Sequence, residues 1–391
     1  MADTEIMSDY TRLAAADKTG AESRFARKQK MYTIREHFAI VCKTARGLTA
    51  LWPDIRRGTV SAMAPMTTIV AFVTIALILN FLVGLHDAGS TVSTAITSRS
   101  LGPRLALALA VIGEFLGPLL FGVAIATTLG ASIVEPHAID IAVLFALLIS
   151  SMLWTLLTWF FGMPSSASHA LVGGLVGAAA AAHGWEIIQI SGLMKVIGTL
   201  LVAPPLAFLA GFALMKLIIA MCAGMSPRVG IAFKRAQVAT LFGLSLSHGA
   251  NAAQRTIAVI AMGLVICGYE ESFAVPFWVR LASAATIALG ALCSSSRTMR
   301  TVGMRIFRVR PVDAFAAQTS AALVMAAAAL LGGVASTTQV TNSALLGVGS
   351  AERVAKIRWY VVRDIAITWL FTLPAAALTG ALLYHLLRLL A

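Results

Sequence analysis

Two residues that can bind or transfer a proton, His86 and Asp87, are adjacent inside an otherwise apolar stretch of the chain. Burying an ionisable pair in such a stretch is expensive, so the pair usually belongs to a path for a substrate or an ion. The alternative is a structural pair satisfied by neighbouring helices. Small and hydroxyl-bearing residues around the pair favour function, because they let backbone dipoles approach a ligand. These residues are Gly84, Gly89, Ser90, Thr91 and Ser93.

A second candidate group combines serine residues with the expected start of a short helix. The run from Pro164 to His169 precedes an apolar piece at 170–182. Proline and serine favour the first turn of a helix, where several N–H groups lack an intrahelical partner and can bind an anion. Ordinary capping is the alternative interpretation. The candidate residues of this run are Ser165, Ser166, Ser168 and His169.

Both patterns recur in the second half of the chain. The five residues 84–88 align with 249–253 at an offset of 165, which brings Asn251 into the second copy. The five residues 165–169 align with 335–339 at an offset of 170, ahead of the apolar piece 340–348. Two motifs in the same order at nearly one offset indicate a duplication. The second helix start contributes Ser336, Thr337 and Thr338.

Two further polar residues lie within or beside apolar segments. Glu114 stands alone in 105–129, where it could bind a cation or proton or bond to a neighbouring helix. His248, beside Gly249 and Asn251, is also a candidate.

Several chemistries lack their sequence signature. No G-x-x-x-x-G-K-[ST] nucleotide cradle and no G-x-S-x-G elbow is present, which disfavours ATP-driven transport and a serine hydrolase. The four cysteines have neither metal-site nor disulfide spacing. We therefore expect no catalytic residues, no metal and no cofactor.

Composition identifies the class of protein that must position these residues. Of 391 residues, 59% are hydrophobic and 12% charged, whereas soluble domains average roughly 45–50% and 25%. The net charge of +13 lies mostly between apolar runs, where it orients loops relative to a lipid bilayer and does not point to nucleic acid. The sequence predicts an all-α polytopic membrane protein without a cleaved signal peptide.

The apolar runs predict about 10–12 membrane segments. Seven runs are long enough to cross: 67–85, 105–129, 139–161, 196–222, 276–293, 314–334 and 365–387. Four pieces are too short to cross alone: 170–182, 238–246, 256–267 and 340–348. Short pieces at corresponding places in two halves are typical of the discontinuous helices of secondary transporters.

Loop charges predict the orientation of the two halves. Basic loops near residues 99–104, 228–235, 297–310 and 353–363 are expected in the cytoplasm, and the acidic connections outside. This gives inverted-topology repeats and an external N-terminus, although the basic cluster 24–30 favours the cytoplasm for that end. The predicted organisation is a polar, basic, partly disordered or amphipathic extension 1–60, a first repeat 67–222, a cytoplasmic linker 223–237 and a second repeat 238–391.

Taken in order, six stretches from about residue 67 to the C-terminus resemble the PiT inorganic phosphate transporter family. They are 84–88, 97–103, 164–174, 245–251, 275–279 and 336–338. The resemblance implies an inverted-repeat carrier that moves phosphate with sodium or protons, and whose site forms where the repeated motifs meet near the middle of the bilayer.

The chain departs from the family pattern at four positions. Ser90 stands where the family usually has asparagine, Ala252 where it has aspartate, Gln318 where it has glutamate, and Gln339 where it has histidine. Loss of a carboxylate at position 252 removes an oxygen ligand that sodium would need, by analogy with other hard cations. It also weakens discrimination of protonated phosphate from sulfate.

These observations predict a symporter of inorganic phosphate in the plasma (inner) membrane, with proton coupling favoured over sodium. The expected substrate residues are Ser90, Ser165, Ser166, Ser168, Asn251, Ser336, Thr337 and Thr338, and the expected coupling residues are His86, Asp87, Glu114 and His169. A sulfate or related oxyanion permease and a non-transporting membrane sensor stay open as alternatives, and so does assembly as a homodimer.

Overall fold

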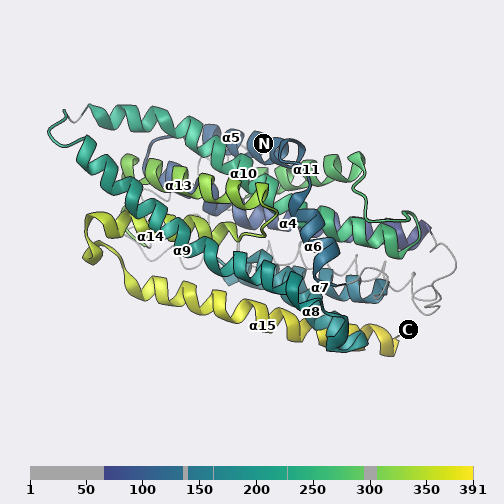
Figure 1. Cartoon of the computed structure of the whole chain (residues 1–391). Helices are drawn as coiled ribbons and strands as arrows, with labels where there is room; N and C mark the ends of the chain where they lie inside the picture. Colours follow the sequence, from purple (N-terminus) through teal and green to yellow (C-terminus); the bar gives the residue numbers. More distant parts are fainter. Residues whose placement is uncertain (1–65, 135–139, 162, 227, 295–305, 391) are drawn as a thin grey trace, which may run out of the picture. The chain divides into compact units, whose positions relative to one another are not determined.

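The computed structural model describes residues 66–134, 140–161, 163–226, 228–294 and 306–390 (Figure 1). The chain divides into two units, 1–52 and 53–391, and every described residue belongs to the second. The predicted extension 1–60 and parts of two predicted loops, 135–139 and 295–305, lie outside the described residues.

The helices of the first half follow one another in a simple order. They are α4 (Met66–Thr97), α5 (Pro103–Leu120), α6 (Ala124–Ser132), α7 (Ile141–Phe161), α8 (Ala167–His183), the 3-10 turn η2 (Trp185–Ile187) and α9 (Ile190–Met221). Local chemistry sets their ends. Pro103 occupies the first turn of α5, where its missing N–H has no intrahelical partner to lose. Gly184 follows α8 with a positive φ that favours glycine.

The second half repeats this order. Its helices are α10 (Val229–Ile266), α11 (Phe277–Leu292), α13 (Pro311–Leu330), α14 (Thr337–Glu352), the 3-10 turn η4 (Val354–Lys356) and α15 (Trp359–Leu390). Pro311 begins α13 as Pro103 begins α5. Since α10 begins at Val229, most of the predicted linker 223–237 lies in a helix.

Membrane-spanning capacity agrees with the predicted class. Among the described residues, seven helices are long and apolar enough to cross a bilayer. With the shorter helices α8, α11 and α14 they make ten candidate membrane segments in the described part of the chain, within the predicted range of about 10–12. The prediction of an all-α polytopic membrane protein is confirmed.

Helices pack reciprocally between the two halves. α4 packs on α11 while α10 packs on α5, and α8 packs on α15 while α14 packs on α9 (Figure 1). A duplicated unit related to its copy by a two-fold axis produces this pattern, because each contact then occurs twice with the partners exchanged.

α15 shows that the two halves are inverted. Its first residues adjoin η4, which follows the end of α14, whereas the hydroxyl of Tyr384, near its other end, donates to Asp140 Oδ2 at 3.4 Å, just before α7. About 25 helical residues separate these ends, or about 38 Å. The α7–α8 hairpin and the α13–α14 hairpin therefore enter from opposite sides.

One expectation about helix breaks is wrong. The apolar pieces 238–246 and 256–267 belong to the single helix α10, and α4 continues through His86 and Asp87. Hydroxyl groups here bond to carbonyls of the preceding turn without interrupting α4, as Ser93 does to Ser90 O at 2.8 Å. The interruptions fall between α7 and α8 and between α13 and α14.

Close helix packing in α10 leads to a stability prediction. A Cβ added at Gly249 would collide with the backbone of Glu114 in α5, whereas one at Gly243 would meet open space. We expect Gly249→Ala to lower the free energy of unfolding by about 1–3 kcal/mol, because a backbone cannot move aside. Gly243→Ala should be neutral or stabilising by up to about 1 kcal/mol. Thermal unfolding of the purified variants in detergent would contradict this if both behaved alike.

A buried carboxylate joins the start of α13 to the turn that follows α14. Asp313 accepts hydrogen bonds from the Arg310 backbone at 2.8 Å and from Lys356 Nζ at 3.2 Å, and its side chain is fully buried. Arg310 Nη2 also donates to Asp313 Oδ1 at 3.0 Å. We expect Asp313→Asn to lower the free energy of unfolding by about 1–3 kcal/mol, because it weakens the charge-assisted bonds to Arg310 and Lys356.

The control for this prediction is Asp364→Asn. Asp364 is 64% exposed and pairs with Arg363 at the surface. Exposed pairs contribute little, so the change should stay within about 0.5 kcal/mol. Equal unfolding temperatures for the two variants would show that the buried cluster does not hold the helix ends together.

Candidate functional site

The starts of α8 and α14 meet inside the protein. Thr338 Oγ1 donates to Ser165 O at 2.7 Å, and Ser168 Oγ donates to Ala335 O at 3.0 Å. Each helix start thus bonds to the turn that precedes the other, and all four residues are buried. Helix N-termini carry about half a positive charge each, so two of them face one place far from water.

Capping accounts for only part of the serine and threonine chemistry here. Ser166 is the N-cap of α8 and accepts from His169 N at 3.2 Å. Ser336 occupies the same position before α14 and makes no capping bond, although its hydroxyl lies 3.2 Å from that of Thr338. The hydroxyl of Thr337 is buried without a partner. The start of α14 therefore keeps hydrogen-bonding capacity for a ligand.

Arg255 of α10 points at this junction. The residue is 3% exposed, and its Nη1 donates to Ser168 Oγ. Its Nε and Nη2 atoms are buried without a partner. In the part of the chain that the structure describes, no carboxylate forms an ion pair with it. A guanidinium and two helix starts together make a strongly positive, buried locus suited to an oxyanion.

Asn251 lies one helical turn before Arg255 on α10. Its Nδ2 donates to Gly333 O at 3.4 Å, while its Oδ1 is buried without a partner. Ser90 on α4 is also buried, and its hydroxyl has no partner. Buried polar groups are almost always hydrogen-bonded, so such a concentration of unpaired atoms is typical of a binding site.

A chain of four ionisable side chains crosses the interior beside the helix starts. His86 Nδ1 lies 2.7 Å from Asp87 Oδ1, and His248 Nε2 lies 3.8 Å from Asp87 Oδ2. His248 Nδ1 lies 2.9 Å from Glu114 Oε1. All four are buried, and carboxylate and imidazole alternate along the chain. The His86–Asp87 and His248–Glu114 contacts are within hydrogen-bonding distance, whereas His248 Nε2 has no hydrogen-bond partner among the described residues and must approach Asp87 before a proton can pass between them.

The structure thus brings the predicted residues into two adjoining groups. His86, Asp87 and Glu114 belong to the ionisable chain, with His248 as the link between the two acids. His169 lies apart from that chain, and its Nδ1 is 2.6 Å from Ser166 Oγ at the start of α8.

Two of the residues that depart from the family pattern, Gln318 and Ala252, are buried in the structure. Gln318 donates to Thr94 Oγ1 at 3.0 Å and accepts from Thr240 Oγ1 at 2.7 Å, so this neutral amide joins α13 to α4 and α10. Ala252 is buried in α10 and offers no polar atom. The second half therefore lacks a carboxylate at the position matching Asp87.

Arg255 is the functional candidate absent from the sequence-based set. The sequence does contain a feature that points to Arg255: it lies four positions after Asn251 and therefore on the same face of the helix. The residue borders the apolar piece 256–267 and thus resembles an ordinary flanking charge. Only its burial in the continuous helix α10 distinguishes it.

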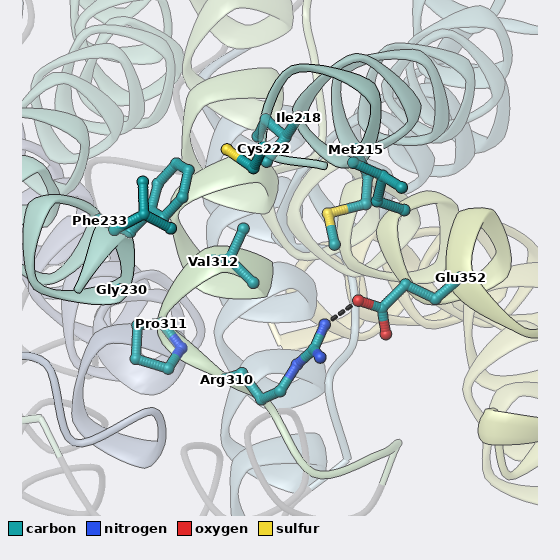
Figure 2. Close-up of a pocket in the computed structure, with 11 residues that line it drawn as sticks. Met215, Ile218, Cys222, Gly230, Phe233, Arg310, Pro311, Val312 and Glu352 are labelled. Atoms are coloured by element: carbon teal, nitrogen blue, oxygen red, sulfur yellow. Dashed lines mark ion pairs between the residues drawn. The ribbon is translucent and has the colours of Figure 1, made fainter. Parts of the chain in front are cut away.

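A pocket at the end of α9 and the starts of α10 and α13 contains none of these residues. Figure 2 shows Arg310 reaching towards Glu352 beside mostly apolar side chains that include Met215, Phe233 and Val312. It offers little polar chemistry for an anion, so the candidate site is the junction of α8, α10 and α14.

Residues 83–380 match the phosphate transporter family, and this range contains every residue of the candidate site. The chain belongs to the phosphate transporter family. A relative from Rhizobium meliloti (strain 1021), named a probable low-affinity inorganic phosphate transporter, is 39% identical over 81% of this chain and 95% of its own length. A Bacillus subtilis (strain 168) protein of the same name is 33% identical over 80% of this chain and 95% of its own length.

The fold of this phosphate transporter family member also has a solved counterpart. A structure described as the sodium-dependent phosphate transporter superposes with a TM-score of 0.75 and covers 83% of this chain and 100% of its own. The two are 24% identical, so the likeness concerns the fold alone. The chain is a multi-pass integral membrane protein of the plasma membrane, and its family consists of transporters, not enzymes.

Proposed function

We propose that this chain is a secondary active symporter that carries inorganic phosphate across the plasma membrane. The observation that supports this best is the meeting of two helix starts beside Arg255, which gives an oxyanion three positive partners in a buried place. The relatives from two bacteria are named inorganic phosphate transporters, which agrees with this substrate.

The anion would lie between the two helix starts. Backbone N–H groups and hydroxyls of the two starts would bind its oxygens, while the second N–H of Asn251 Nδ2 and the hydroxyl of Ser90 would donate further hydrogen bonds from α10 and α4. The proposed residues at the helix starts are Ser165, Ser166, Ser168, Ser336, Thr337 and Thr338. Rocking of one repeat, 67–222, against the other, 238–391, would expose the site alternately on each side.

Protons are the proposed driving ion. His248 faces both Asp87 and Glu114, so it would carry a proton between two buried acids once its Nε2 closes the 3.8 Å separation from Asp87, and His86 would extend that route. His169, at the start of α8, could exchange a proton with the bound anion. Sodium is the alternative, and Ala252 weighs against it because the second half offers no carboxylate oxygen at the matching position.

Two other functions are kept for specific reasons. A sulfate or related oxyanion permease is favoured by Ala252, because a lost carboxylate weakens selection for a protonated anion. A membrane sensor that binds without transport is favoured by the titratable groups absent at Ala252, Gln318 and Gln339.

Uptake by proteoliposomes tests these functions directly. Labelled phosphate should accumulate under an imposed proton gradient and not under a sodium gradient alone, and excess sulfate should compete weakly. Strong competition by sulfate with uptake of labelled sulfate would favour the permease. Phosphate binding without uptake under either gradient would favour the sensor and contradict the symporter.

A further inference from the structure

The duplicated motif carries opposite charges in its two copies. Asp87 and Ser90 of α4 correspond to Ala252 and Arg255 of α10, 165 residues later. Positions three apart lie on the same face of a helix. The first copy therefore presents an acid and a hydroxyl to the interior, whereas the second presents a methyl group and a guanidinium.

The guanidinium of Arg255 is fixed at the junction by one bond and leaves the rest of its donors free. Nη1 donates to Ser168 Oγ, and that hydroxyl in turn donates to Ala335 O at 3.0 Å, next to the start of α14. Nε and Nη2 are buried without a partner. Arginine does not lose its proton in proteins, so this is a permanent charge inside the membrane-embedded core.

A buried charge without an ion-pair partner is strongly unfavourable unless something compensates it, and the attraction of Asp87 offsets only part of the cost at Arg255. Two positive helix starts beside Arg255 increase this cost, since they repel the guanidinium. An oxyanion compensates all three, and the planar fork of arginine matches two oxygens of a phosphate group. A sodium ion in the same place would meet this positive field and, at Ala252, no oxygen ligand.

We propose that Arg255 is a built-in counter-cation for the bound phosphate, occupying the electrostatic role of a co-bound metal cation in the second half of the site. Phosphate binding then needs no sodium, and coupling depends on the ionisable chain of the first half. This inference rests on the proposed substrate, inorganic phosphate, and concerns the charge partner that holds it.

Equilibrium binding of labelled inorganic phosphate to the purified protein tests the proposal without requiring transport. The wild-type affinity should change by less than about threefold when saturating sodium replaces choline. Arg255→Gln should weaken binding at least about 30-fold, because the anion loses its buried charge partner. Arg255→Lys should lie between, since it keeps the charge and loses the fork.

Arg280→Gln is the matched control. Arg280 is another arginine within a membrane helix, and it donates to Leu119 O at 2.7 Å at the end of α5. It makes no contact with the helix starts among the described residues, so its loss should leave the phosphate affinity unchanged.

Thermal unfolding supplies a second readout. Without phosphate, Arg255→Gln should unfold at or above the wild-type temperature, because burial of the guanidinium costs more than its attraction to Asp87 offsets. Added phosphate should raise the unfolding temperature of the wild type and of Arg280→Gln, but not that of Arg255→Gln. These opposite effects separate a lost binding group from a damaged fold.

The results that would contradict the role of Arg255 differ from those that would contradict the proposed phosphate symport. If sodium tightens wild-type phosphate binding more than about tenfold, or if Arg255→Gln binds phosphate like the wild type, Arg255 is not the counter-cation. The phosphate symporter would survive both results. A wild-type protein that binds no phosphate in either salt would contradict the proposed substrate as well.

Discussion

Replacement of Asp87 by asparagine is expected to reduce phosphate uptake under a proton gradient about 100-fold, a loss equivalent to about 2.7 kcal/mol. Asp87 is 2% exposed and faces both His86 and His248, at 2.7 and 3.8 Å. Asparagine keeps an oxygen that can accept a hydrogen bond, but it carries no charge and cannot take up a proton. Initial rates of labelled phosphate uptake into proteoliposomes measure the effect.

The control for this variant is Asp364→Asn, which removes a carboxylate of α15 that is 64% exposed. Its uptake should equal that of the wild type, which excludes an effect of net charge. Unchanged, gradient-dependent uptake by Asp87→Asn would remove Asp87 from the coupling mechanism and direct attention to Glu114.

Replacement of Glu114 by glutamine is expected to separate exchange from net transport. Glu114 Oε1 lies 2.9 Å from His248 Nδ1, whereas Oε2 is buried without a partner. Loss of one charge-assisted bond, worth about 1.5–3 kcal/mol, should slow proton-driven accumulation by roughly 10- to 100-fold. Exchange of external for internal phosphate needs no net proton transfer, so it should continue at a rate within about threefold of the wild type.

The exchange assay serves as the internal control for Glu114→Gln, because it reports folding, insertion and phosphate binding in the same vesicles. Loss of both activities would instead assign Glu114 to the structure of the α5–α10 contact. Retention of both would remove Glu114 from the proton route and leave Asp87 as its only acid among the residues proposed here.

The wrong prediction about α10 shows how local patterns can mislead. Glycine, serine and asparagine between two apolar pieces resemble a break, and the sequence around residues 249–253 has all three nearby. In the fold, Gly249 lies against the backbone of Glu114 and the neighbouring Asn251 is buried. Small residues here serve close packing between helices, which stabilises α10 as one helix.

Much of this protein follows from the sequence alone. Hydrophobic runs and scarce charges determine a polytopic helical membrane protein, since an apolar span long enough to cross can satisfy its backbone only as a helix. The motifs 84–88 and 165–169 recur in the second half, which indicates a duplication. The acids Asp87 and Glu114 are recognisable in the sequence because the residues around them are apolar. All of these signals are local, so no tertiary contact is needed to see them.

Only the tertiary structure decided which of these residues meet. His248 joins two acids that belong to other helices, and Arg255 reaches Ser168, 87 residues away in sequence. Both contacts depend on α10 packing against α4 and α5 and on the two hairpins entering from opposite sides. Reciprocal packing of distant helices sets these distances, and no local pattern of residue types encodes it. For that physical reason the sequence identified the acids and the helix starts, whereas only the fold identified Arg255 as the buried cation beside the helix starts.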